Sequence, residues 1–266
     1  MEIRGIIHAH SNYSYDAKLS LVRLREEYIR AGLRFACMTE HTDAMSVESA
    51  RSFVRECELL SDEQFIFIPG FEVPYKRAHV LMIGQRIFFD AYAPTIEVLR
   101  RWTKECPMVI LAHPVRNHFE VDEGLLSEID ALEVWNQQYE GKRVPRTRSL
   151  RLFKTLREKK IELLATGGVD FHRREHLGAP FVTCEVAILN ESQIIEQLRK
   201  GAYTISSAHT YFEGTLTNID AMVRAHRGES AVSVSIIMLG KWVNKICATF
   251  GFSLPKSWKR MIRRTL

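Results

Sequence analysis

Apolar and polar positions follow two alternating periods along the first two hundred residues. Short apolar runs of strand length recur, and between them apolar residues return every three or four positions, which is typical of amphipathic helices. The runs predicted as strands are 3–7, 35–39, 65–68, 79–84, 108–112, 131–136, 163–169, 181–188 and 203–205. The predicted helices are 21–34, 46–60, 94–104, 143–160 and 191–200. Ser20 is the expected N-cap of the first helix and Gly201 the expected end of the last.

This alternation predicts one α/β domain. No Gly/Ser/Pro-rich linker interrupts it, and a chain of this length suits a barrel of largely parallel strands better than a small open sheet. The alternation fades beyond about residue 207. We therefore expect a barrel domain at 1–207 and a C-terminal helical extension at 208–266.

The composition is that of a soluble globular protein, with 46% hydrophobic and 26% charged residues. The formal net charge is +5, but five cations and no acid lie in 256–264, so the remainder is close to neutral. This argues against a body that coats long nucleic acid. Five single cysteines without a CxxC pair favour neither a zinc ribbon nor a disulfide framework. A cytoplasmic protein without a signal peptide or a membrane-spanning segment is the expectation.

The extension is open to two interpretations. Apolar and aromatic residues at helical spacing precede its basic end, so it could form an amphipathic helix for a peripheral membrane or protein contact. The alternative is a helix packed on the barrel with a solvated basic end. The packed helix is the favoured interpretation.

Candidate chemistry begins with His8 and His10 at the end of the first strand. In an extended strand, side chains two positions apart share a face, so both imidazoles are expected to point the same way. A single His-x-His is common by chance. The rest of the chain strengthens the interpretation of this pair as metal ligands, because metal-ligand residues also end later strands. These residues are His41, Glu72, His113, Asp170 and His172, whereas His79 begins its strand.

In a barrel the carboxyl ends of the strands meet on one face, so these side chains are expected to converge. Imidazole and carboxylate together suit Zn²⁺, Mn²⁺ or Fe²⁺. The sequence here resembles the PHP (polymerase and histidinol phosphatase) superfamily of metal-dependent phosphoesterases over about residues 1–205. The matching motifs are 8–16 (HAHSNYSYD), 39–41 (TEH), 69–72 (PGFE), 111–114 (LAHP) and 169–172 (VDFH).

The resemblance implies a distorted, TIM-like (β/α)7 barrel that binds two to three divalent ions. The first ion would be held by His8, His10, Glu72 and Asp170. Glu72 would bridge to a second ion, which His79 and His113 also bind. The third ion would be held by Asp16, His41 and His172. Glu40 stands where the family's motif has aspartate, and it is not a proposed ligand.

The implied reaction is hydrolysis of a phosphate ester through a metal-activated hydroxide, with His10, Glu72 and Asp170 at its centre. Arg116, Arg173 and Arg174 follow ligand motifs and are candidates for binding the phosphate. His209 is a weaker candidate donor, and the basic residues at 142–151 are interpreted as a solvated helix face. The substrate is expected to be a small phosphorylated molecule or a short oligonucleotide. The alternatives are an exonuclease or polymerase-associated role on longer nucleic acid, and a non-catalytic metal-binding scaffold.

Overall fold

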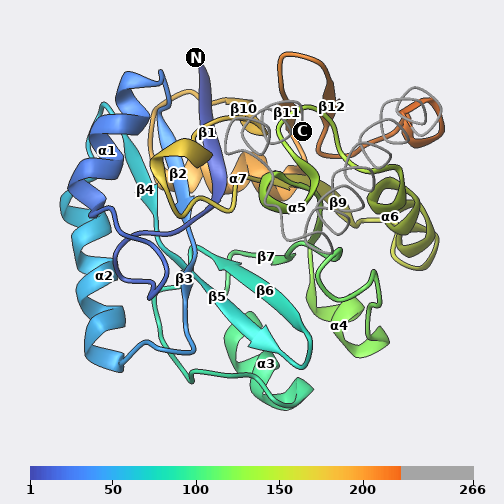
Figure 1. The fold of residues 1–266 in the computed structure, drawn as a ribbon, viewed down its shortest axis with the longest axis horizontal. Coiled ribbons are helices and arrows are strands. Elements are labelled where there is room, and N and C mark those ends of the chain that lie inside the picture. The colour runs from blue at the N-terminus through green and yellow to red at the C-terminus, as the bar shows by residue number, and fades with distance from the viewer. Residues whose placement is uncertain (223–266) are drawn as a thin grey trace, which may run out of the picture.

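The computed structural model describes residues 1–222, and its strands form two six-stranded sheets (Figure 1). The first sheet has the order β12-β11-β10-β1-β2-β4 and the second the order β3-β5-β6-β7-β8-β9. The strands of the first sheet are β1 (Glu2–Ala9), β2 (Phe35–Met38), β4 (Ile66–Ile68), β10 (Phe181–Glu185), β11 (Tyr203–Ser206) and β12 (Tyr211–Glu213). Those of the second are β3 (Glu40–His41), β5 (Gly70–Tyr75), β6 (Ala78–Ile83), β7 (Met108–Leu111), β8 (Ala131–Asn136) and β9 (Leu164–Gly168).

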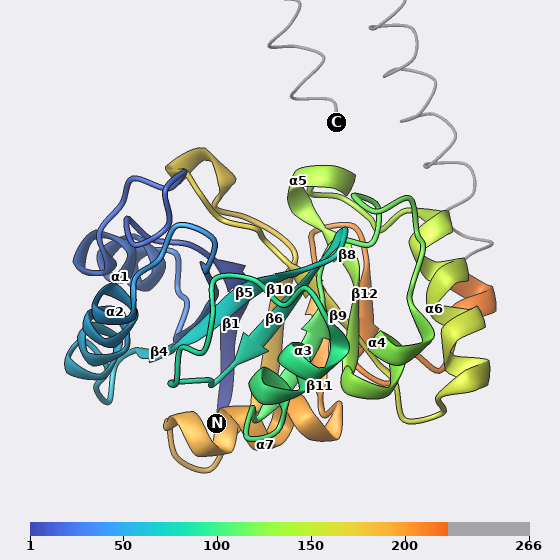
Figure 2. The ribbon, with the colours of Figure 1, turned by 90° about the horizontal axis from the view of Figure 1, so that it is seen from below.

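The helices lie outside the strands. In Figure 1, α1 and α2 flank one side of the molecule and α6 the opposite side. In Figure 2, α7 lies at the end where the chain begins. The helices are α1 (Leu21–Arg30), α2 (Val47–Leu59), α3 (Ile96–Thr103), α4 (Glu123–Glu128), α5 (Gln137–Glu140), α6 (Thr147–Lys159) and α7 (Glu191–Lys200), with a short 3-10 helix, η1, at Arg174–His176.

Local sequence explains where most helices begin and end. Ser20 caps α1 by accepting a hydrogen bond from the backbone of Arg23, and Gly201 ends α7 in a left-handed conformation, both as predicted. The start predicted for the helix at 143 is wrong. Pro145 disfavours helical angles at residue 144, so the helix does not run through 143–144, and α6 begins at 147 after the extended N-cap residue Arg146.

Strand direction accounts for the unusual place of His79. β1, β2 and β4 pair in parallel, as do β7, β8 and β9, but β6 runs antiparallel to both β5 and β7. Because β6 runs in the opposite direction to β5 and β7, its first residues lie at the edge of the sheet where those two strands end. His79 therefore reaches the same edge as residues that terminate the other strands.

The two sheets adjoin at three points. Only Thr39 separates β2 from β3, and only Pro69 separates β4 from β5. On the other side, the end of β1 meets the segment after β9, where Val169 N donates to Ile7 O at 2.9 Å and His10 N donates to Phe171 O at 2.9 Å. The fold is thus mixed α/β, and the seven-stranded barrel stays a prediction.

The described start of the predicted extension contributes to the first sheet. β12 pairs antiparallel with β11, and Phe212 is buried. The interpretations of the basic amphipathic end fall on 223–266, outside the described residues. Within residues 1–222, no helix combines the length and apolar character that crossing a bilayer requires.

Candidate metal centre

All nine predicted metal ligands lie around one buried carboxylate or next to one another. The central carboxylate belongs to Glu72 on β5, which is only 1% exposed. His41 on β3 is its direct neighbour in the parallel ladder. The remaining ligands come from β1, β6 and the segments after β1, β7 and β9.

One oxygen of Glu72 faces the His-x-His pair. Its Oε2 atom lies 3.1 Å from His8 Nε2 and 3.2 Å from His10 Nε2. Asp170 Oδ1 lies 3.6 Å from the first of these nitrogens and 3.7 Å from the second. Two imidazoles and two carboxylates therefore surround one point, in the grouping that the resemblance implied.

The other oxygen of Glu72 faces a second pair of histidines. His113 Nε2 lies 3.0 Å from Glu72 Oε1, and His79 Nδ1 contacts the same oxygen. Since its two oxygens face different histidine pairs, Glu72 is placed to bridge two cations.

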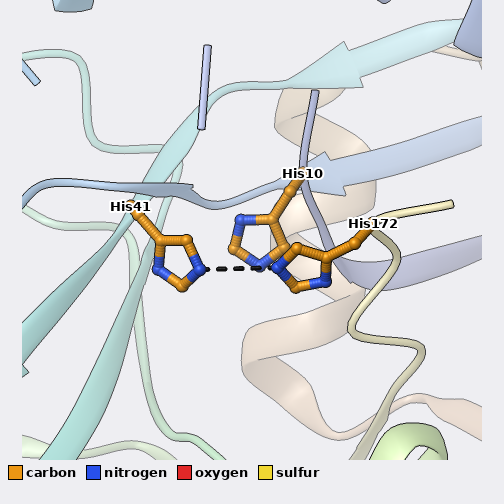
Figure 3. A group of neighbouring side chains, drawn as sticks. All are labelled: His10, His41 and His172. Carbon is orange, nitrogen blue, oxygen red and sulfur yellow. Dashed lines mark hydrogen bonds between the residues drawn. The ribbon is translucent and has the colours of Figure 1, made fainter. Parts of the chain in front are cut away.

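The third group is more open. Asp16 Oδ2 lies 3.1 Å from His172 Nε2 and 3.6 Å from His41 Nε2, and the Asp16 side chain is 39% exposed. Figure 3 shows the rings of His10, His41 and His172 converging, with a dashed line joining His41 Nε2 and His172 Nε2 at 3.4 Å. The His10 ring stacks on both, with centroid distances of 4.4 Å and 4.2 Å.

The backbone at three ligands adopts the left-handed region. The φ angles are 66° at His8, 22° at His113 and 53° at Asp170, conformations that are uncommon for residues with side chains. At His8 the ladder between β1 and β2 also shifts register, so the regular strand predicted through this pair is wrong. Both imidazoles still reach Glu72. Strained backbone of this kind concentrates at functional sites.

The surroundings of His10 leave one nitrogen free for a metal. The Ser14 hydroxyl donates to Glu40 Oε2 at 2.5 Å and lies 3.2 Å from His10 Nδ1. Because Ser14 has a single hydroxyl proton, His10 donates to it through Nδ1–H, which leaves Nε2 as a lone pair. This atom is buried and has no hydrogen-bond partner among the described residues. A buried, unpartnered imidazole nitrogen beside two carboxylates is the donor set that a divalent cation fits.

The pKa shifts in the site agree with a His10 ring that offers Nε2 to a metal ion. Burial, together with the charges of His41 and His172, lowers the pKa of His10 to about 3, so this ring is neutral at pH 7. Burial alone would raise the pKa of Glu72, but the surrounding histidines, His8 foremost, hold it well below its usual range. Burial likewise opposes the ionised form of Asp16, yet His41 and His172 lower its pKa to about 2. His10 is therefore a neutral imidazole beside ionised carboxylates, whereas at His8 burial is outweighed by Glu133, Asp170 and Glu72, which raise its pKa well above the usual value.

The three predicted phosphate-binding arginines have different places. Arg116 reaches the site, with Nη1 3.2 Å from His79 Nδ1. Arg174 instead forms an exposed ion pair with Glu27 on α1. Arg173 precedes η1, and its charge contributes to lowering the pKa of His176 after the larger effect of burial. His209 lies on an exposed turn between β11 and β12. Within residues 1–222, Arg116 is the one of these three arginines that hydrogen-bonds to a predicted ligand.

Several basic residues at 142–151 contact neighbouring loops beside the site. Arg146 donates to Tyr139 O at 2.6 Å, and Lys142 donates to Glu175 O at 2.8 Å. The Arg148 guanidinium lies over the Phe119 ring, 4.4 Å from its centroid. Part of this predicted solvated face thus has a structural role.

Sequence reasoning missed two buried polar residues behind the ligands, Glu133 and Asn136 on β8. Glu133 Oε1 lies 2.8 Å from His8 Nδ1, and Asn136 Nδ2 lies 3.3 Å from Asp170 Oδ2. The available signal was a carboxylate inside an otherwise apolar run, since every residue of β8 is buried. A charged residue at such a position requires a partner.

Comparison with solved structures identifies the fold. The chain matches a two-domain protein from Bacteroides vulgatus containing a predicted PHP-like metal-dependent phosphoesterase, with a TM-score of 0.56 and 16% identity over 78% of this chain and 65% of that one. The chain has the fold of a PHP-like phosphoesterase. It also matches Endonuclease Q in complex with a 27-mer duplex carrying an abasic lesion, with a TM-score of 0.55 and 17% identity over 76% of this chain and 57% of that one.

A further match is the lesion-specific endonuclease PfuEndoQ from Pyrococcus furiosus, with a TM-score of 0.52 and 17% identity over 77% of this chain and 58% of that one. This chain thus spans less than two thirds of the length of each of these structures. Neither protein-family models nor curated proteins match the sequence. The resemblance to PHP proteins is confirmed in the fold, and at these identities the fold is what the likeness shows.

Proposed function

We propose that this chain is a PHP-superfamily, divalent-metal-dependent phosphoesterase that hydrolyses a phosphate ester of a small molecule or a short oligonucleotide. The observation that carries the proposal is the buried, unpartnered Nε2 of His10, which faces Glu72 and Asp170. Such an atom is costly to leave without a partner, and a metal ion would satisfy it.

The ligand groups correspond to two to three ions, with Mn²⁺, Zn²⁺ or Fe²⁺ as candidates. Bound there, divalent ions would neutralise phosphate oxygens and make water more acidic. The protein's own contribution is to hold the ligands before any ion arrives. Ser14 keeps the proton of His10 on Nδ1, and Glu72 directs one oxygen to each histidine pair.

Arg116 is the residue placed to bind the substrate. Its guanidinium lies at the rim beside His79, and arginine binds phosphate oxygens in a bidentate manner. It would orient the ester so that the scissile phosphorus faces the ligand cluster. Arg173 and Arg174 remain weaker candidates, because the ion pair with Glu27 engages the second of them.

A distorted seven-stranded barrel is part of the same proposal. The backbone hydrogen bonds between the end of β1 and residues 169–171 join the sheets on one side. The near-continuous strand pairs β2/β3 and β4/β5 join them on the other. A barrel formed in this way places all the ligands at one mouth.

Two tyrosines favour an oligonucleotide as the substrate. The Tyr15 ring is 66% exposed and stacks on His41 with a centroid distance of 5.3 Å. The Tyr139 ring is 36% exposed and lies 5.2 Å from the His113 ring. Exposed aromatic faces beside a phosphate site can stack on unpaired bases.

The test is a phosphoester panel measured with the metal-free full-length chain and with added Mn²⁺ or Zn²⁺. Substrates are p-nitrophenyl phosphate, bis-p-nitrophenyl phosphate, short single-stranded DNA and RNA, and a duplex with an abasic site. Metal-dependent hydrolysis is expected in the wild type and is expected to be lost in His10→Ala. His118→Asn, which changes an exposed histidine outside the cluster, serves as the matched control and should retain activity.

The panel also separates the alternatives. Cleavage confined to the duplex would favour an endonuclease acting on longer nucleic acid, as the Endonuclease Q complex suggests for that protein. Metal binding without hydrolysis of any ester would favour a scaffold and refute the proposed enzyme.

A further inference from the structure

Glu133 is a buried carboxylate in β8 with three partners at the site. His113 donates its backbone N–H to Glu133 Oε2 at 2.6 Å, and Asn136 Nδ2 donates to the same oxygen at 2.9 Å. The other oxygen, Oε1, lies 2.8 Å from His8 Nδ1. The side chain of Glu133 is completely shielded from solvent. Both oxygens of Glu133 are occupied by these three hydrogen-bond partners, so we do not assign it as a metal ligand.

The contacts of Glu133 determine which nitrogen of His8 carries the proton. An ionised carboxylate only accepts hydrogen bonds, so the facing Nδ1 of His8 must be the donor. A neutral His8 ring then has its lone pair on Nε2. This nitrogen points at Glu72 Oε2 and Asp170 Oδ1, at 3.1 Å and 3.6 Å, where the first ion is proposed to bind.

The chain is shaped locally to accommodate this carboxylate. The pairing of β8 with β9 shifts register between Glu133 and Trp135. A bulge of this kind re-aims side chains, and here Glu133 and Asn136, three residues apart, contact each other. Opposite them, Gly168 leaves the space, because a Cβ atom built there would lie 1.6 Å from Glu133 Oε1. Any side chain at 168 would displace the carboxylate.

We propose that Glu133 is a positioning residue that fixes the metal-binding tautomer of His8 and the backbone of His113, and that Asn136 extends this control to Asp170. The proposal rests on the proposed metal site, and it assigns to Glu133 a role outside the ligand set. A carboxylate behind a metal-binding imidazole holds the ring and makes it a stronger ligand.

The substitution Glu133→Gln tests this role because glutamine has nearly the same shape. An amide cannot satisfy both sides of the pocket. If its oxygen faces His8, its NH₂ group opposes the donors of His113 and Asn136. If its NH₂ group faces His8, the proton of the ring moves to Nε2 and obstructs the ion.

The first measurement is the affinity of the metal-free, full-length chain for Mn²⁺ and Zn²⁺, by competition with a chromophoric chelator. Glu133→Gln should bind the tightest ion about 10- to 100-fold more weakly than the wild type. Glu140→Gln is the matched control, because Glu140 also has a buried carboxyl oxygen and contacts Ser149 rather than a ligand. It should bind ions as the wild type does.

The second measurement is the ¹⁵N NMR spectrum of the histidine rings without metal at high pH, where His8 is neutral. The wild type should show His8 protonated at Nδ1, and Glu133→Gln should shift the ring toward the Nε2 tautomer. Unchanged metal affinity together with an unchanged tautomer in a folded Glu133→Gln protein would overturn the proposal.

If Glu133→Gln does not fold by circular dichroism, Glu133→Asp replaces it, since aspartate keeps the carboxylate but shortens its reach. Intermediate ion affinity is then expected, and wild-type affinity would contradict the proposal. These binding experiments do not depend on turnover. Absence of hydrolysis in the wild type would refute the proposed function, whereas a folded Glu133→Gln protein with both the metal affinity and the His8 tautomer of the wild type would refute the positioning role.

Discussion

The proposed metal centre has two halves that are held in different ways. The inner half consists of His8, His10, Glu72, His79, His113 and Asp170, and its ligands are mostly buried. Protein groups behind them fix His8 through Glu133 and His10 through Ser14 and Glu40. The outer half consists of Asp16, His41 and His172, which mainly contact one another and the inner ligands.

This difference indicates how the two halves should bind ions. The inner ligands are oriented before binding, so an ion there does not need to order them. In the outer half, Asp16 is partly exposed and lies in the loop after β1. We therefore expect inner ions to bind tightly and the outer ion to exchange more readily.

The largest effect is expected from breaking the inner half. His10→Ala removes the imidazole that faces Glu72 Oε2, and Asp170→Ala removes the carboxylate that faces His10 Nε2. Each should lower metal-dependent hydrolysis about 1,000-fold or more, since metal stabilisation of the transition state is worth several kcal/mol. Steady-state kinetics at saturating Mn²⁺ measure the loss. Wild-type rates in either variant would contradict the assigned site.

A smaller effect is expected from the outer half. Asp16→Asn should reduce the metal content by about one ion per chain and lower the rate about 10- to 100-fold. Elemental analysis after gel filtration tests the content, and excess Mn²⁺ should restore part of the rate. Loss of every ion in this variant would show that the halves are not independent.

The buried carboxyl of Glu140, which lies outside the metal centre, has a pKa shifted in the opposite direction from that of Glu72. Burial raises the pKa of Glu140 to about 8 from an ordinary value of 4.5, despite the hydrogen bond from Ser149 and the charge of Arg146, whereas histidines lower the pKa of Glu72. Between pH 4.5 and about 8 the folded chain keeps a proton that the unfolded chain releases, so the free energy of unfolding should fall as pH rises.

Glu140→Gln should remove this fall and stabilise the protein at pH 9 by on the order of 5 kcal/mol, with little change at pH 4.5. Urea unfolding of the metal-free protein at the two pH values measures it. The same pH slope in wild type and variant would show that Glu140 does not cause the dependence.

The smallest effect is expected from Arg116, which lies beside His79 at the rim of the site. Arg116→Ala should raise KM about tenfold with a smaller change in kcat, because a charged hydrogen bond to phosphate is worth about 1.5 kcal/mol or more. Arg116→Lys should recover only part of the loss, since lysine cannot bind phosphate through two parallel hydrogen bonds. An unchanged KM in the alanine variant would place substrate binding elsewhere.

The sequence predicted which side chains would lie together because strand ends are visible as breaks in apolar runs. His113 and Asp170 follow the runs at 108–112 and 163–169 directly, and His41 lies two residues after the run at 35–39. Parallel strands bring such positions together. His79 was included from its motif, and the reversed direction of β6 explains how it reaches the other candidates.

Other features depend on contacts between distant residues, which local patterns do not contain. The bulge at His8 and the left-handed backbone of Asp170 arise where β1 meets the segment after β9. The proposed positioning role of Glu133 depends on its contact with His8, which lies 125 positions away in sequence. Arg174 looked equivalent to Arg116 in sequence, yet α1 offers it a carboxylate from Glu27.

Anomalous X-ray diffraction from crystals grown with Mn²⁺ or Zn²⁺ tests the central claim most directly. The account predicts two or three anomalous peaks, with one beside His8 Nε2, His10 Nε2, Glu72 and Asp170, and a second across Glu72 beside His79 and His113. The peak beside Asp16, if a third ion binds, should be the weakest. A well-ordered structure in which saturating metal gives no peak beside Glu72 would contradict the account.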